Sequence, residues 1–387
     1  MKSKNIKICG ITTRAATSRV MLNNLEFLNQ HGYDACIICE PDKLLETDLK
    51  LKNIRYIPFP MKAGTVNVFE VVKNVIAFIK IFRKERFDII QYASCNASLY
   101  ASIAGFITQV PVRILLQWGL TYLGFSGTKL KIFRLIEKIT CRLSTHVQPD
   151  SHSNFKFAVE EHLFPSKKGN VIWHGSACGL DFSRFDITKK NIWREQIRSE
   201  FSISSDAKIY GFIGRVVRDK GINELLEAFI RYTSVYDNNY LLILGPLDGL
   251  DELREDLVKE TITNRKIIFT GGRSDINKCY ASLDYVVMPS YREGFSMVLL
   301  EAAAMGIPVI SSKINGSIDF VIEKETGFLF DVKSSESLFD ALVKTYNLPQ
   351  EEYCMLSKNA YNTALAGYSL DQFNHYYLED RNKKIRI

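Results

Sequence analysis

The sequence predicts an α/β protein made of two domains, each with a parallel sheet covered by helices on both faces. Its 387 residues exceed what one hydrophobic core usually organises, so two cores are expected. Short apolar runs alternate with longer helical patterns in both halves of the chain, which is typical of parallel sheets. Polar residues interrupt this alternation between positions 175 and 205. We therefore expect one domain at 1–182, a second at 183–368, and a C-terminal helix at 369–387 that crosses back to the first.

The strands are expected where short apolar stretches are bounded by turn residues. In the first half these stretches are 6–10, 35–39, 55–57, 89–92, 113–117 and 146–149. In the second half they are 209–213, 240–244, 267–270, 285–288 and 309–311. Apolar residues at helical spacing predict helices between the strands, among them 20–31, 66–86 and 295–305, and a last one at 369–377.

Two glutamates eight positions apart form the most informative motif, Glu293-Gly-Phe-Ser-Met-Val-Leu-Leu-Glu301. Because the motif follows the strand at 285–288, Glu293 should lie on a strand-to-helix turn and Glu301 about two turns inside the helix. A helix does not use its first-turn amides in its own hydrogen bonds, so these amides are expected to bind an anion. They belong to Gly294, Phe295, Ser296 and Met297. Carboxylates on both sides of an anion site suit a ligand with phosphate between two polyols, such as a nucleotide sugar.

A second phosphate-binding motif is expected at the turn after the strand 209–213. Gly214-Arg-Val-Val-Arg-Asp-Lys-Gly221 joins this strand to a helix that begins at about Ile222. A strand, a glycine turn and a helix are how α/β proteins build phosphate sites. Arg215 and Lys220 bring two cations that can neutralise a departing diphosphate. Neither G-x-G-x-x-G nor a Walker sequence is present, which argues against hydride transfer and nucleoside triphosphate hydrolysis.

Composition narrows the class further. Apolar residues make up 46% and charged residues 24%, as in ordinary globular proteins. The first ten residues run directly into a strand, and no apolar run approaches the roughly 18 residues of a membrane-spanning helix. We therefore expect a cytoplasmic protein without a secretory signal. The eight cysteines are expected to be reduced, since they occur in apolar strand and helix patterns and no second pair completes a zinc site with Cys36 and Cys39.

The excess positive charge is confined to the first half. Residues 1–182 hold 24 Lys and Arg against 14 Asp and Glu, whereas the remainder is slightly acidic. Much of this charge lies in 80–86 and in 129–142, where Leu130, Phe133, Ile136 and Ile139 are separated by cations. A basic amphipathic helix suggests an anionic membrane surface as a partner. A helix that packs its apolar side on its own sheet and solvates its cations has the same pattern, and both interpretations can hold together.

In this order, the motifs of the second half resemble those of glycosyltransferase family 4. They are Gly214-Arg-x4-Lys-Gly221, Glu293-Gly-Phe-Ser with Glu293-x7-Glu301, the continuation Glu301-Ala-x2-Ala-x-Gly-x-Pro-Val-Ile, and Thr326-Gly-Phe-Leu-Phe. The first half is similar to the subgroup that extends surface polysaccharides on polyprenyl-diphosphate carriers. That similarity rests on Leu135-Ile-Glu-Lys-Ile-Thr-Cys-Arg142, Gly175-Ser-x-x-Gly-Leu-Asp181 and Phe185.

The resemblance implies a retaining transferase of the GT-B fold, with two Rossmann-like domains facing across a cleft. It implies that Arg215 and Lys220 hold the donor diphosphate, that Glu301 accepts hydrogen bonds from the ribose, and that Glu293 meets the transferred sugar. It also implies that the turn containing Arg273 borders the base and that the loop from Gly10 to Arg14 faces the cleft. No cofactor and no metal are expected, in keeping with the absence of an Asp-x-Asp motif.

The leading hypothesis is therefore transfer of a hexose or N-acetylhexosamine from a nucleotide sugar, expected to be UDP-linked, to a lipid-linked saccharide in capsular, O-antigen or exopolysaccharide synthesis. The reaction is expected at the inner face of the cell membrane. No nucleic acid is expected as a partner. The alternatives are a nucleotide-sugar epimerase on the same fold and a non-catalytic nucleotide-sugar-binding protein.

Two positions depart from the family pattern. Trp118 stands where family members carry His or Arg, and could stack on an acceptor sugar or belong to the core. Cys178 stands where the subgroup has Asn.

Overall fold

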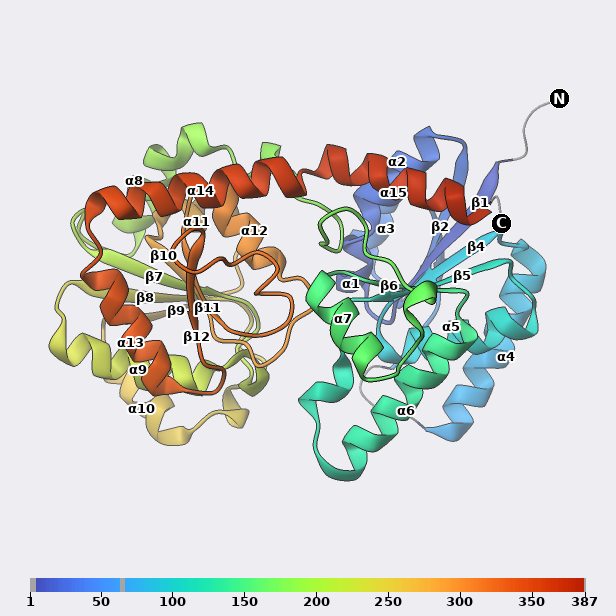
Figure 1. Ribbon diagram of the computed structural model, residues 1–387, viewed down its shortest axis with the longest axis horizontal. Helices are drawn as coiled ribbons and strands as arrows, with labels where there is room; N and C mark the ends of the chain where they lie inside the picture. The colour runs from blue at the N-terminus through green and yellow to red at the C-terminus, as the bar shows by residue number, and fades with distance from the viewer. Residues whose placement is uncertain (1–4, 63–66, 386–387) are drawn as a thin grey trace. The chain divides into compact units, whose positions relative to one another are not determined.

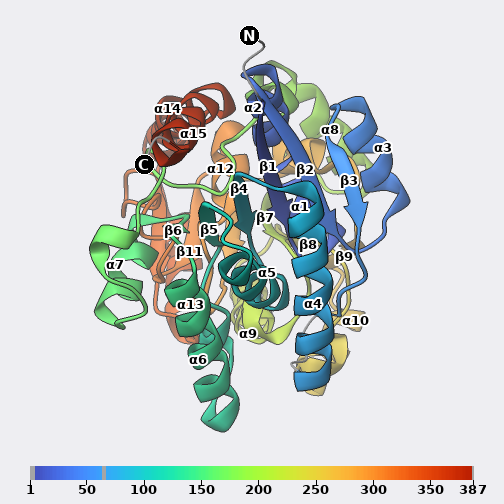
Figure 2. The ribbon, with the colours of Figure 1, turned by 90° about the vertical axis from the view of Figure 1, so that its right-hand side faces the viewer.

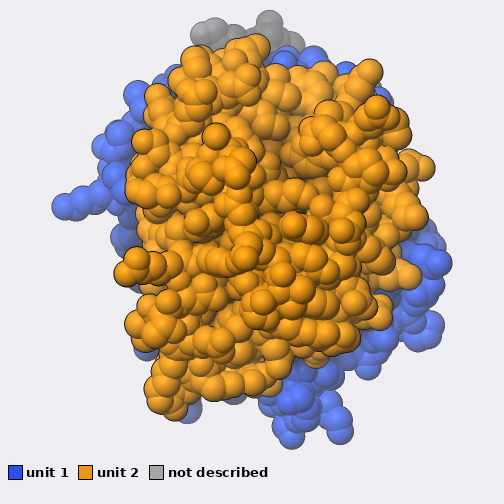
Figure 3. All heavy atoms as spheres, turned by 90° about the vertical axis from the view of Figure 1, so that its left-hand side faces the viewer, with its two compact units in different colours: residues 1–179, 370–387 blue, residues 180–369 orange. Residues whose placement is uncertain are grey.

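The computed structural model describes residues 5–62 and 67–385. Its contacts divide the chain into two compact units, residues 1–179 with 370–387 and residues 180–369 (Figure 3). Two expectations fall on residues outside 5–62 and 67–385. Residues 1–4 belong to the segment from which we expect no secretory signal, and Val66 is the expected start of a helix.

The first unit contains a six-stranded parallel sheet in the order β3-β2-β1-β4-β5-β6 (Figure 2). Its strands are β1 (Ile6–Ile11), β2 (Tyr33–Cys39), β3 (Arg55–Pro58), β4 (Ile89–Tyr92), β5 (Val112–Gln117) and β6 (His146–Pro149). The α-helices are α1 (Ala15–Arg19), α2 (Leu22–Gln30), α3 (Lys43–Leu51), α4 (Val68–Glu85), α5 (Cys95–Ile107), α6 (Gly127–Leu143), α7 (His152–Glu160) and α15 (Leu370–Ile385). Separate apolar clusters fill the two faces of this sheet, because side chains alternate along each strand. Cys36 and Cys39 accordingly lie in different clusters.

The second unit repeats this plan, with strand order β12-β11-β10-β7-β8-β9. Its strands are β7 (Lys208–Ile213), β8 (Asn239–Leu244), β9 (Ile267–Gly271), β10 (Tyr285–Met288), β11 (Val309–Ser312) and β12 (Gly327–Phe330). Its α-helices are α8 (Lys190–Glu200), α9 (Ile222–Val235), α10 (Glu255–Thr263), α11 (Ile276–Ser282), α12 (Met297–Ala304), α13 (Ser335–Tyr346) and α14 (Gln350–Tyr368). The predicted α/β class with two parallel sheets is confirmed.

Both sheets reverse their strand order next to their first strand. In the first unit β1 lies between β2 and β4, and in the second β7 lies between β8 and β10. Loops that leave the carboxyl ends of such a strand pair diverge, and the crevice between them is where open α/β sheets bind ligands. The switch points therefore lie at the ends of β1 and β4, and of β7 and β10.

The structure corrects several predicted bounds. The helix expected at 20–31 is α2, which begins at Leu22 and ends at Gln30, while the short helix α1 before it and the strand β12 were not indicated by the sequence pattern. The helix expected at 295–305 begins only at Met297, because Ser296 is still extended. Arg86, the expected end of a helix, adopts a left-handed conformation that terminates α4 at Glu85.

The last helix, α15, belongs to the first unit (Figure 1), and a buried arginine fixes it to the first sheet. Arg381 is fully buried and donates hydrogen bonds to Gln91 of β4 (3.0 Å) and to Gln148 of β6 (2.9 Å). It also pairs with Asp380, which Lys384 contacts in turn. Although burial alone would raise the pKa of Asp380, these two cations lower it to about 2.

Replacing Arg381 with Ala should lower the free energy of unfolding by about 3 kcal/mol, because a buried carboxylate and two buried amides lose their shared partner. Chemical denaturation followed by circular dichroism measures this loss. Lys383→Ala is the matched control, since its side chain is exposed on the same helix and its removal should leave stability unchanged. Equal stabilities of the two variants would contradict a structural role for the buried arginine.

Candidate donor-binding site

The switch point of the second unit brings together three of the residues singled out by the sequence. The loop after β7 carries Arg215 and Lys220, and the loop after β10 carries Glu293. Lys220 Nζ donates a hydrogen bond to Glu293 Oε1 at 2.5 Å, with side chains only 23% and 17% exposed. Arg215 is exposed and makes no ion pair with any described residue. The two loops thus present a partly shielded ion pair and one further cation at the carboxyl edge of the sheet.

The close approach of these loops depends on glycine. Gly221 adopts a φ of +71°, and a Cβ atom there would lie 2.1 Å from the carbonyl oxygen of Pro289. Gly316, after β11, has a φ of +85°, and a Cβ atom there would lie 1.6 Å from the carbonyl oxygen of Gly294. No side chain fits in either place, so the loop around Glu293 is held from both sides by backbone.

The helix after this loop begins later than expected. Gly294, Phe295 and Ser296 precede α12, and Met297 is its first residue. Glu301 therefore lies just over one turn inside the helix, where the sequence predicted about two. Gly214, at the end of β7, completes the turn that carries Arg215.

Glu301 is partly buried and receives a hydrogen bond from Tyr280 of α11 (2.8 Å). Burial raises the pKa of the Glu301 carboxyl, while the hydrogen bond from Tyr280 and the charge of Arg184 act in the opposite direction. The charged form of Glu301 thus lowers the stability of the fold. Its partner Tyr280 was not identified from the sequence. It lies 21 residues upstream in a helix without a recognisable motif.

Two further predicted site residues lie on other strands and loops. Arg273 follows β9, an outer strand of the sheet, and its guanidinium pairs with Glu200 and with Asp275 (2.8 Å). These two carboxylates fix the side chain, and the expectation that its turn borders the base stays a prediction. Gly10 lies inside β1, where a Cβ atom would meet Met21 at 2.9 Å. The loop that was expected to start at Gly10 therefore begins only at Thr12.

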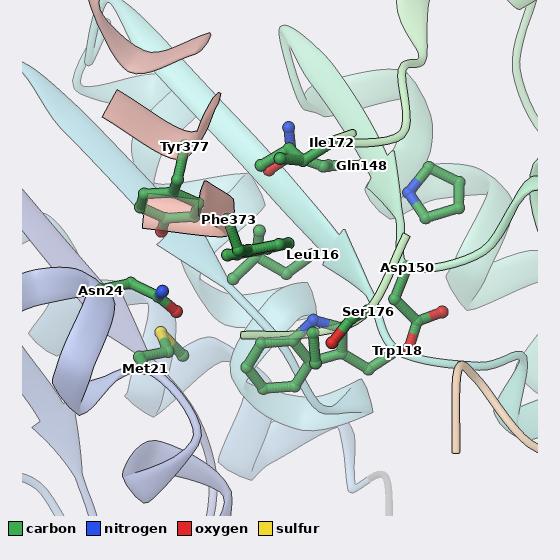
Figure 4. A pocket seen from close by; sticks show the side chains of 12 residues that line it. Met21, Asn24, Leu116, Trp118, Gln148, Asp150, Ile172, Ser176, Phe373 and Tyr377 are labelled. Carbon is green, nitrogen blue, oxygen red and sulfur yellow. The ribbon is translucent and has the colours of Figure 1, made fainter. Parts of the chain in front are cut away.

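Trp118, the departure from the family pattern, follows β5 in the first unit. It is partly buried and lines a pocket together with Asp150, Ser176 and Phe373 (Figure 4). The cavity measures about 10 Å³, which is the space of a single water molecule. Trp118 therefore lines a small cavity and also packs against one of the apolar clusters of the first unit.

The described residues contain neither a metal cluster nor a membrane-spanning helix. Within residues 5–62 and 67–385, no three or more His, Cys, Asp or Glu side chains are placed to hold a metal ion together. No helix in the same ranges is both long and apolar enough to cross a membrane.

Comparison with known proteins assigns the second unit. Residues 194–363 match the family model described as Glycosyl transferases group 1. The chain carries a group 1 glycosyl transferase domain. This domain contains Arg215, Lys220, Glu293 and Glu301, and its identification confirms the glycosyltransferase resemblance of the sequence.

Similarity to individual proteins extends beyond the group 1 glycosyl transferase domain. The chain is 29% identical over 345 residues to the capsular polysaccharide biosynthesis glycosyltransferase CapM of Staphylococcus aureus, covering 89% of this chain and 88% of that protein. It is 23% identical over 376 residues to an Escherichia coli UDP-Gal:alpha-D-GlcNAc-diphosphoundecaprenol alpha-1,3-galactosyltransferase, covering 94% of each. The structure of Anabaena Alr3699/HepE in complex with UDP-glucose superposes with a TM-score of 0.79 at 18% identity, covering 98% of this chain and 100% of that one. The fold is thus that of GT-B glycosyltransferases.

Glu301→Gln should raise the Tm at pH 8, because the amide keeps the contact with Tyr280 without the cost of a buried charge. In the folded protein the pKa of the Glu301 carboxyl lies above the usual 4.5. The cost of the buried charge is therefore present at pH values above this folded pKa. It is lost as the pH falls below 4.5, where the carboxyl is protonated in both the folded and the unfolded protein. Thermal unfolding at pH 8 and pH 4 measures the difference. Exposed Glu325→Gln is the control, and a lower Tm of Glu301→Gln at pH 8 would contradict the assignment.

Proposed function

We propose that this glycosyltransferase moves a hexose or N-acetylhexosamine, with retention of anomeric configuration, from a UDP-sugar to a lipid-linked saccharide in surface polysaccharide synthesis. The names of the relatives support this class of reaction. The Staphylococcus aureus protein is named for capsular polysaccharide biosynthesis, and the Escherichia coli protein for transfer from UDP-Gal to a diphosphoundecaprenol-linked sugar. A neighbour in structure is described in complex with UDP-glucose.

The observation that carries the proposal is the ion pair between Lys220 and Glu293 at the switch point of the group 1 domain, with Arg215 exposed on the same loop as Lys220. A donor diphosphate has two negative charges to neutralise, and two cations on one turn provide for both. The adjacent start of α12 adds the positive end of a helix dipole. In this arrangement the ribose meets Glu301, and the transferred sugar meets Glu293.

During transfer, the bond between the anomeric carbon and the β-phosphate oxygen breaks while a bond to an acceptor hydroxyl oxygen forms. The hydroxyl proton passes to the departing diphosphate, so no protein nucleophile is needed. Negative charge grows on the diphosphate as its bond breaks. Arg215 and Lys220 therefore stabilise the transition state more than the bound donor, which is the condition for catalysis. We further propose that these two cations suffice without a metal ion.

Arg215→Met should lower kcat about 100-fold, because the protein loses one of the two cations that neutralise the departing diphosphate. Purified protein is incubated with UDP-Gal, UDP-Glc, UDP-GalNAc or UDP-GlcNAc and a polyprenyl-diphosphate-linked saccharide, and extension of the acceptor is followed by mass spectrometry. Arg265→Met is the matched control, since Arg265 is an exposed arginine of the same unit that precedes β9, at the opposite edge of the sheet.

Three outcomes of this assay separate the possibilities. Transfer that is lost in Arg215→Met and kept in Arg265→Met supports the proposal, and EDTA should leave the rate unchanged. UDP binding by calorimetry without transfer of any sugar would favour a non-catalytic binding protein. Epimerisation of UDP-GlcNAc in the absence of acceptor would favour an epimerase.

We also propose that the first unit rests on an anionic membrane surface through the starts of α4 and α6. Both helices follow strands and so begin at the carboxyl edge of the sheet, and Figure 2 shows them on the same side of the unit, flanking α5. The inner face of α6 packs Phe133 and Ile136 into the core, so the interpretation as a packed helix holds. Its outer face nevertheless leaves Ile132 and Leu135 exposed by 48% and 59%.

Cations surround these exposed apolar side chains. Lys131, Arg134 and Lys138 flank Ile132 and Leu135 on α6, while Phe69 of α4 is 86% exposed four residues before Lys73. Apolar side chains between cations match the boundary between anionic headgroups and acyl chains. A lipid-linked acceptor is held in that boundary, so a membrane at this edge would bring the acceptor to the protein.

Lys131→Gln combined with Lys138→Gln should weaken binding to vesicles containing about 30% phosphatidylglycerol by about 10-fold or more, since each cation near an anionic surface contributes about 1 kcal/mol. Sedimentation with vesicles measures the partition. The double variant Lys344→Gln and Lys358→Gln, at exposed positions of the second unit, is the control. Equal partition of wild type into phosphatidylglycerol and pure phosphatidylcholine vesicles would contradict the membrane proposal.

A further inference from the structure

The Lys220–Glu293 pair has a second ion pair directly beside it. Arg292 Nη2 lies 2.8 Å from Asp219 Oδ2, with side chains 28% and 31% exposed. Asp219 precedes Lys220 on the loop after β7, and Arg292 precedes Glu293 on the loop after β10. The two loops are therefore joined by two consecutive ion pairs, although they are separated by 73 residues in sequence.

The charges in these two pairs have opposite order. One loop reads negative then positive, at Asp219 and Lys220, and the other reads positive then negative, at Arg292 and Glu293. A slip of one loop by a single residue would bring like charges together, either two carboxylates or two cations, and would be repelled. The four charges thus specify one register between the loops, which neither ion pair alone could do.

Further contacts around Tyr291 hold the same register. The backbone amide of Tyr291 donates to the carbonyl oxygen of Asp219 at 2.9 Å. The Tyr291 hydroxyl donates to Glu224 Oε1 of α9 at 2.7 Å. Together with the contact between Gly221 and Pro289, these bonds fix Asp219 and Arg292 from the backbone outward.

We propose that Asp219 and Arg292 are positioning residues that hold Lys220 at the place where the donor diphosphate departs. The inference rests on the proposed function, because it assigns Lys220 its role in transfer. Since Lys220 has a flexible four-carbon stem, its ammonium position depends on what surrounds it. Loss of the neighbouring pair leaves Lys220 on the protein but displaces its ammonium group, and displacements of about 1 Å can cost 100-fold in rate.

Arg292→Gln and Asp219→Asn should each lower kcat by about 10-fold or more while the donor KM changes by less than about 3-fold, because the misplaced charge matters most in the transition state. The double variant should be no slower than the slower single variant, since both remove the same pair. Arg292→Lys, which keeps a cation opposite Asp219, should recover most of the loss. Glu336→Gln is the control, because Glu336 is exposed on α13 and also belongs to an ion pair, with Arg231 of α9. Its kcat and donor KM should match those of wild type.

Thermal unfolding of each variant distinguishes positioning from folding. A purely structural role predicts a lower Tm with unchanged kcat in the folded fraction, or equal losses in Arg292→Gln and Arg292→Lys, and either result would overturn the proposal. If wild type transfers no sugar from any donor, the proposed function fails instead. If wild type is active and Arg292→Gln retains its kcat, only the positioning role fails.

Discussion

Two loops that leave neighbouring parallel strands must stay together at the switch point of the second unit, and the ion pair between Lys220 and Glu293 crosses the gap between them. Loops at such a point diverge toward helices on opposite faces of the sheet, so a site that uses both needs contacts between them. Glycines supply the close backbone approach, and oppositely ordered charges supply the register. Two cations and two carboxylates are then brought to one edge of the sheet. Under the proposed function, the cations meet the anionic diphosphate and the carboxylates meet the hydroxyl groups of the ribose and of the transferred sugar.

The same site carries costs that the rest of the unit must offset. Glu301 is an ionisable group in a setting that raises its pKa, with Tyr280 as a hydrogen-bond donor. Such a residue lowers stability and is retained where a ligand needs its oxygen atoms. Buried polar groups of the first unit are of another kind. The Arg381 network joins α15 to β4 inside the sheet and to β6 at its edge, and its geometry serves attachment of this helix.

Much of the fold could be predicted because local patterns determine it. The bounds of β4, β6 and β10 agree with the apolar runs, and α9 begins at Ile222 as the glycine turn indicated. Local signals failed where tertiary contacts decide. The start of α12 depends on extended Ser296, and Gly10 is explained by the side chain of Met21 above it. The motif residues Lys220 and Glu293 were identified from sequence, but the neighbouring ion pair was not, because Asp219 and Arg292 resemble ordinary surface charges until the loops meet. The partner of Arg273 could not be predicted for the same reason, since Glu200 lies 73 residues away in sequence.

The central claim is that the loops after β7 and β10 form the donor diphosphate site. A crystal structure of the protein with bound UDP tests it most directly. We expect the β-phosphate within hydrogen-bond distance of Arg215 or Lys220, with the ribose hydroxyls on Glu301. UDP bound elsewhere in the chain, or at this edge with both cations turned away from its phosphates, would contradict it.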